Sequence, residues 1–139
     1  MAKAADAKPP KPAKMNVDMA LELFSIAGDL SSALDLDFQG FHVFSGSQNL
    51  RAEAIIEAQA KTVALVTALS RDAPCPPRFV NIGGGFGIPY FPGEQPLDLA
   101  PIGAHLHELV GIAARDIPGA TLVVELGRYL VGEAGVYVA

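Results

Sequence analysis

The chain has 139 residues, of which 50% are hydrophobic, and its formal net charge at pH 7 is −5. This content can bury the core of one modest domain, or of a piece of a larger one. The acidic excess argues against a nucleic-acid partner, because phosphate backbones select for surplus Lys and Arg. No run approaches the ~20 apolar residues that cross a bilayer, and no signal peptide is visible, so we expect a cytoplasmic protein with no membrane partner.

Hydrophobic periodicity divides the chain into a tail and an alternation of helices and strands. Residues 1–14 are mostly Ala, Lys and Pro. We expect a disordered tail there, because such a segment cannot bury enough apolar surface to offset the entropy of ordering. From Met15 onward the pattern predicts, in chain order, a helix over 18–33, a strand over 38–46, a helix over 49–70, a strand over 78–85, a helix over 98–115 and a strand over 121–126. A short turn or helix and a further strand end the chain.

The two later helices carry apolar stripes that predict one packed face on each. For the helix over 49–70, Asn49 is a candidate N-cap, and the stripe consists of Ile56, Ala60, Val63 and Val66. For the helix over 98–115, the residues at helical spacing are Leu99, Ile102, Leu106, Leu109 and Val110.

Strands that alternate with helices imply parallel pairing through right-handed crossovers. Three such βα units are too few for a closed (β/α)₈ barrel, which takes about 250 residues. Periodicity therefore leaves two α/β fold classes open. One is a small open sheet, and the other is a set of consecutive βα units that form part of a barrel.

Polar residues and glycines follow all three predicted strands: Ser47, then Gly83, Gly84 and Gly85, then Glu125 and Arg128. Ligands of parallel α/β folds bind at the carboxyl ends of the strands, so one shared site is expected. Glycines let backbone N–H groups approach a phosphate closely, although a tight turn without a ligand would also use them. No Gly-Lys-Ser/Thr follows, which excludes a Walker loop.

Glu125 and His42 are the titratable residues with the most informative positions. A carboxylate that ends an apolar strand is costly unless it is paired, so Glu125 meets either a protonated ring nitrogen or Arg128. His42 lies two residues before Phe44, and both therefore face the same side of their strand, toward a ligand site or the core. The sequence has no HExxH motif and no cluster of Asp and His, so we expect no metal site.

Three segments together resemble the pyridoxal-phosphate-dependent group IV decarboxylases, the diaminopimelate/ornithine/arginine family. They are GFHVFSGSQ (40–48), VNIGGGFGIPY (80–90) and VVELGRYLVGEAGVYV (123–138), in the family's order and with suitable separations. The resemblance covers residues 34–139. It implies part of an alanine-racemase-like (β/α)₈ TIM barrel, with 15–139 as the C-terminal half of the barrel, and pyridoxal 5′-phosphate at the strand ends.

The resemblance also implies a role for each site residue. The backbone N–H groups of Gly83, Gly84 and Gly85 would bind the cofactor's phosphate with help from Ser47, and Arg128 would contact this phosphate or a substrate carboxylate. Glu125 would face the pyridine nitrogen, and His42 and Phe44 would lie on the cofactor side. The implied partners are a small amino-acid substrate and either a second copy of the chain or a complementing subunit.

The chain departs from the family pattern at three points. Phe44 occupies the position of the histidine that stacks on the cofactor ring, and Leu126 replaces a proline. The family's Schiff-base lysine has no counterpart, because the lysines of this chain lie in the tail or in mid-helix, at positions 3, 8, 11, 14 and 61. We therefore expect a decarboxylase fragment with no catalytic residue of its own. The alternatives are a non-catalytic decarboxylase-like module, a decarboxylase of carrier-linked amino acids, and an unrelated phosphate-binding α/β domain.

Overall fold

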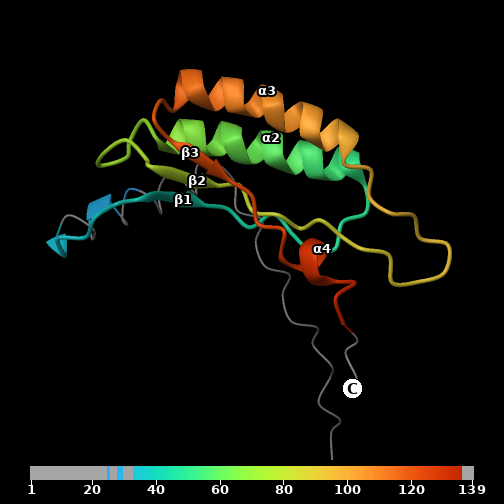
Figure 1. The fold of residues 1–139 in the computed structure, drawn as a ribbon. Coiled ribbons are helices and arrows are strands. Elements are labelled where there is room, and N and C mark those ends of the chain that lie inside the picture. The colour runs from blue at the N-terminus through green and yellow to red at the C-terminus, as the bar shows by residue number, and fades with distance from the viewer. Residues whose placement is uncertain (1–24, 26–27, 30–32, 136–139) are drawn as a thin grey trace, which may run out of the picture.

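The computed structural model describes residues 25, 28–29 and 33–135. The ordered elements alternate as the sequence predicts (Figure 1): β1 (Gly40–His42), α2 (Ala52–Leu69), β2 (Phe79–Asn81), α3 (Ala100–Asp116), β3 (Thr121–Val123) and α4 (Gly127–Val131). The predicted tail, most of the helix predicted over 18–33, and the chain beyond residue 135, where the further strand is predicted, lie outside the described residues.

The three strands form one parallel sheet in the order β1-β2-β3. Phe41, Val80 and Leu122 lie side by side across it. Pairing continues one residue beyond β1, where the backbone N–H of Val43 donates to the carbonyl oxygen of Asn81 at 3.0 Å. Because all strands run the same way, their carboxyl ends lie at one edge, from which the segments 43–48, 82–87 and 124–128 leave the sheet.

Helices α2 and α3 lie next to each other and cover one face of the sheet (Figure 1). The alternation of side chains along the strands directs Phe41, Val80 and Leu122 toward these helices. They contribute to a core whose buried members are Val63, Val66, Val80, Ile82, Leu109 and Ile117. His42 and Asn81 have the opposite parity, so they lie on the face of the sheet that α2 and α3 leave uncovered.

The strands are shorter than predicted, since each pairs over three residues. The segment after β1 leaves the extended conformation at Gly46 and Gln48, whose φ angles are +124° and +55°. These angles are incompatible with a continued strand. The predicted strand over 38–46 therefore divides into a short paired part and a following connection that carries site residues.

The prediction that Asn49 caps the first long helix is wrong. Helix α2 has Arg51 at its N-cap position, without a side-chain cap. The backbone of Asn49 instead pairs with the segment after β2, because its N–H donates to Gly85 and its carbonyl accepts from Gly87, both at 2.8 Å. Its side-chain oxygen accepts the N–H of Arg51 at 3.0 Å. Asn49 therefore joins two strand-end segments before the helix begins.

The predicted helix stripes are correct only in part. Val63, Val66, Ile102 and Leu109 are buried, whereas Ala60, Leu99 and Val110 are exposed. Gln59 is buried where the stripe predicted Ala60, with 4% of its surface exposed. Helix α3 begins two residues later than predicted and ends at Asp116. Ile117 is its C-cap residue and is not helical, as the restricted conformation of a residue before Pro118 requires.

Candidate functional site

Residues from all three strand ends line one cavity of about 170 Å³. The segment after β1 contributes Phe44, Ser47 and Gln48, and the segment after β2 contributes Gly84 and Gly85. The segment after β3 supplies the two charged lining residues, Glu125 and Arg128. The structure thus brings together most of the site residues predicted from the sequence, at the edge where ligands of parallel α/β folds bind.

The glycines are required first by the close approach of neighbouring backbones. A Cβ atom on Gly84 would lie 1.5 Å from the carbonyl oxygen of Glu125, and one on Gly85 would lie 2.6 Å from that of Gly46. Gly83 and Gly85 also have positive φ angles, +75° and +80°. Only glycine meets both demands. The tight turn considered for these residues is therefore present, and it brings the three strand ends into contact.

The N–H of Gly83, predicted to bind a phosphate with those of Gly84 and Gly85, instead donates to Asn81 Oδ1 at 2.9 Å. The other two glycines and Ser47 leave hydrogen-bond donors available at the cavity. Within the part of the chain that the structure describes, the N–H groups of Gly84 and Gly85 have no acceptor, and the hydroxyl of Ser47 has no partner. We call Ser47, Gly84 and Gly85 the glycine cradle. Backbone and hydroxyl donors without internal partners fit an anionic group such as a phosphate.

Glu125 is held from two other strands. Its Oε1 accepts a hydrogen bond from Asn81 Nδ2 at 3.0 Å, and its Oε2 lies 3.5 Å from His42 Nε2. The side chains of Glu125 and His42 are each 56% exposed, so the carboxylate is oriented without being buried. The alternative in which Glu125 pairs with Arg128 does not describe this structure.

Arg128 is oriented by the segments after β1 and β2. Its Nη1 donates to Gln48 Oε1 at 3.0 Å, and its guanidinium carbon lies 5.7 Å from the ring centroid of Tyr90. Gln48 Nε2 in turn donates to the carbonyl of Ile88 at 2.5 Å. Arg128, the one cation among the described lining residues, is therefore held beside the glycine cradle by one amide and one aromatic ring.

Phe44 lies at the opening of the cavity, with 76% of its surface exposed. Phe44 lies beyond the end of β1 and lines this cavity, whereas His42 ends β1 and does not line it. An exposed phenyl ring can contact the face of another flat ring, but it cannot donate or accept a proton. This residue therefore offers stacking surface without acid–base chemistry.

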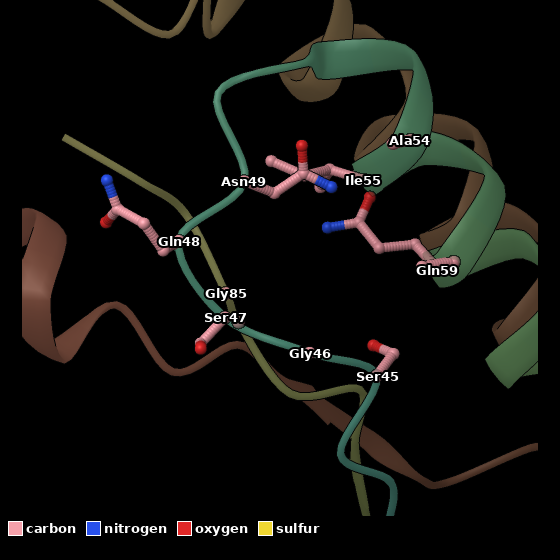
Figure 2. Close-up of a pocket in the computed structure, with 11 residues that line it drawn as sticks. Ser45, Gly46, Ser47, Gln48, Asn49, Ala54, Ile55, Gln59 and Gly85 are labelled. Atoms are coloured by element: carbon pink, nitrogen blue, oxygen red, sulfur yellow. The ribbon is translucent and has the colours of Figure 1, made fainter. Parts of the chain in front are cut away.

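A second cavity, of about 250 Å³, lies between α2 and residues 45–49. Figure 2 shows Gln59 and Ser45 extending toward this space, whereas Gln48 points away from it. The Oε1 of Gln59 is buried and has no hydrogen-bond partner in the described part of the chain. Among the described residues, no charged side chain lines this cavity, which distinguishes it from the cavity beside Arg128.

Asn81 was not predicted as a site residue, and Gln48 was predicted only by its position after the first strand, next to Ser47. Both bind side chains that lie 44 and 80 residues away along the chain, so no local pattern identifies their partners. A signal was available for Asn81, since it is the polar residue of an otherwise apolar segment before the glycines.

Lys61 lies on α2 and does not line either cavity at the strand ends. Its Nζ is 2.5 Å from Glu57 Oε1, and the hydrogen bond and charge of Lys61 lower the pKa of Glu57. Among the described residues, no three or more His, Cys, Asp or Glu side chains are placed to hold a metal ion. Within the same residues, no helix is both long and apolar enough to cross a membrane.

Comparison with known proteins defines the class to which this fold and site belong. Residues 10–132 match the family described as pyridoxal-dependent decarboxylase, pyridoxal binding domain, and the chain belongs to this family. The resemblance drawn from the three sequence segments is confirmed. The described βα units are accordingly part of a (β/α)₈ barrel, and the expected cofactor, pyridoxal 5′-phosphate, agrees with the domain's description.

Individual relatives show how similar the chain is to known proteins. The chain is 41% identical over 103 residues to an L-glutamyl-[BtrI acyl-carrier protein] decarboxylase of Niallia circulans, an alignment that covers 73% of this chain and 24% of the relative. It is 40% identical over 100 residues to a diaminopimelate decarboxylase of Thermoplasma acidophilum, covering 71% and 24%. The arginine decarboxylase structure from Paramecium bursaria Chlorella virus aligns with a TM-score of 0.46 and 24% identity, over 84% of this chain and 29% of that one. The chain spans about a quarter of the length of these curated relatives.

Proposed function

We propose that this chain supplies the phosphate and ring contacts of a pyridoxal-phosphate-dependent amino-acid decarboxylase. The observation that carries the proposal is the cavity shared by three strand ends, with unpaired donors in the glycine cradle and an oriented carboxylate at Glu125. A phosphate fits the donors of Ser47, Gly84 and Gly85, and a protonated pyridine nitrogen fits Glu125.

When bound, the cofactor supplies an electron-accepting ring for the loss of CO₂ from an amino acid. In this proposal the glycine cradle and Arg128 bind the phosphate, and Arg128 also balances its charge. Glu125 holds a proton at the pyridine nitrogen, and His42 orients the other carboxylate oxygen. Phe44 contacts one face of the ring and excludes water from it.

We propose an amino acid as the substrate, of the diaminopimelate type. A carrier-linked amino acid is the second candidate, favoured by the relative at 41% identity that acts on a glutamyl group on an acyl-carrier protein. The replacement of the family's ring-stacking histidine by Phe44 also favours a carrier-linked amino acid. The two relatives differ by one percentage point in identity, so identity alone does not choose between these substrates.

A lysine that binds the cofactor covalently has to come from outside the residues described here, because Lys61 faces away from the site on α2. We propose that the activity belongs to a longer protein, or to a complex with a second copy or a complementing subunit, in the cytoplasm. The alternative is a non-catalytic decarboxylase-like module, which would use the same cavity to bind a phosphate ester without turnover.

The proposed phosphate site is tested by replacing its cation. We expect Arg128→Gln to weaken the binding of pyridoxine 5′-phosphate about tenfold, the effect of one charge-assisted hydrogen bond. Arg115→Gln is the matched control, because Arg115 lies at the end of α3 and pairs with Asp116. Binding is measured from the amide shifts of Gly84 and Gly85 during an NMR titration. Equal loss in both variants, or none in either, would refute the site.

A further inference from the structure

Asn81 lies on the middle strand of the sheet and contacts residues of two strand-end segments. It ends β2, it pairs in register with His42 on β1 and Val123 on β3, and it is half-buried. Its side chain makes two hydrogen bonds in opposite directions. Nδ2 donates to Glu125 Oε1 at 3.0 Å, and Oδ1 accepts the backbone N–H of Gly83 at 2.9 Å.

The two partners fix which way the amide of Asn81 points. The N–H of Gly83 can only donate, so it must face the amide oxygen, and an ionised Glu125 can only accept, so it must face the amide nitrogen. Gly83 is buried, and Asn81 Oδ1 is the acceptor that satisfies its N–H. A buried N–H without an acceptor is costly, which makes this contact a constraint on the glycine turn.

We infer that Asn81 is a positioning residue that sets the two ends of the cofactor site relative to each other. Through Gly83 it orients the turn that continues into the glycine cradle, and through Glu125 it orients the carboxylate proposed to meet the pyridine nitrogen. The inference rests on the proposed function. It adds that one amide couples the phosphate end to the ring end, so a change at this side chain alters the preference between ligands.

Aspartate is the substitution that separates the two hydrogen bonds. Asn81→Asp has nearly the same shape and retains an oxygen for the N–H of Gly83. It loses the donor to Glu125 and places a second carboxylate about 3 Å from the first, where like charges repel. Asn81→Leu removes both hydrogen bonds at similar volume.

The first measurement uses the full chain without ligand and follows hydrogen exchange at the Gly83 amide. We expect protection to be retained in Asn81→Asp and to fall about tenfold in Asn81→Leu, the effect of one lost hydrogen bond. Equal protection in the wild type and Asn81→Leu overturns the inference. If Asn81→Leu does not fold, loss of protection in folded Asn81→Asp is the overturning result, because the aspartate keeps the acceptor.

The second measurement compares two probes, pyridoxine 5′-phosphate and inorganic phosphate, in the wild type and Asn81→Asp. Pyridoxine 5′-phosphate has the ring but no aldehyde, so it forms no covalent bond with lysine. We expect Asn81→Asp to lower the preference for pyridoxine 5′-phosphate over phosphate about tenfold, because the contact of Glu125 with the ring is displaced. A general loss of structure would weaken both probes alike.

The outcomes separate this inference from the proposed function. An unchanged preference in Asn81→Asp, alongside a wild-type preference for the ring, overturns the positioning role and leaves the site intact. A wild type that binds both probes equally overturns the proposed contact between Glu125 and the ring, and the positioning role falls with it. A lower preference with retained Gly83 protection supports both.

Discussion

Glu125 and Arg128 are three residues apart in sequence, yet their side chains bond to different parts of the site. Glu125 is held by Asn81 and His42, and Arg128 is held by Gln48 beside Tyr90. This separation keeps one carboxylate and one cation apart at the cavity, as the proposed contacts with a ring nitrogen and a phosphate require. A direct ion pair between the two would cancel both charges.

Sequence reasoning identified the residues of this site better than their contacts. Residue types and their places after strand ends were enough to select Ser47, the glycines, Glu125 and Arg128. The contact between Gln48 and Arg128 spans 80 residues and depends on how far each strand-end segment turns after its strand. Such angles arise from tertiary packing, so no local pattern could have predicted the pair.

Gly84 gives the sharpest residue-scale prediction. Its Cβ would lie 1.5 Å from the backbone oxygen of Glu125, and a backbone neighbour cannot rotate away as a side chain can. We therefore expect Gly84→Ala to destabilise the chain by about 3 kcal/mol, measured by urea unfolding, because the ends of β2 and β3 must separate.

The matched control for Gly84→Ala is the same substitution in α3, at Gly103. A Cβ there meets nothing within 4 Å, and alanine favours helix over glycine by about 1 kcal/mol. We expect Gly103→Ala to be neutral or stabilising. If both alanine variants unfolded at the same urea concentration, the close approach of the strand ends would be wrong.

At the scale of elements, the order of strands and helices was predictable, and their limits and buried faces were less so. Apolar runs bounded by Gly and Pro locate the elements because burial acts on whole segments. Which residues of α2 are buried depends on the sheet beneath it and on the segment 45–49. These neighbours bury Gln59 and leave Ala60 exposed, which periodicity alone could not indicate.

Gln59 provides a test of packing at the element scale. Its buried Oε1 has no partner among the described residues, so the amide incurs a desolvation cost that leucine would avoid. We expect Gln59→Leu to raise the free energy of unfolding by about 1 kcal/mol. Gln95→Leu, on an exposed loop, serves as the control and should change it little. A destabilised Gln59→Leu would mean that the amide has a partner.

At the scale of the whole molecule, the described βα units are part of a (β/α)₈ barrel. Helices α2 and α3 cover one face of a parallel sheet (Figure 1). The site residues gather at the carboxyl ends of its strands. The face opposite the helices carries His42 and Asn81, as the interior of a barrel would. The family could be predicted because its three segments are local sequence patterns, and the family match over residues 10–132 includes most of them.

The central claim is that this chain holds the cofactor's contacts without its covalent attachment point. Titration of the full chain with pyridoxal 5′-phosphate, followed by borohydride reduction and mass measurement of its peptides, tests this most directly. We expect weak, reversible binding, seen as shifts of the Gly84 and Gly85 amide signals, and no stoichiometric adduct at a defined lysine. A stoichiometric adduct at Lys61, or glycine amides that do not respond, would contradict it.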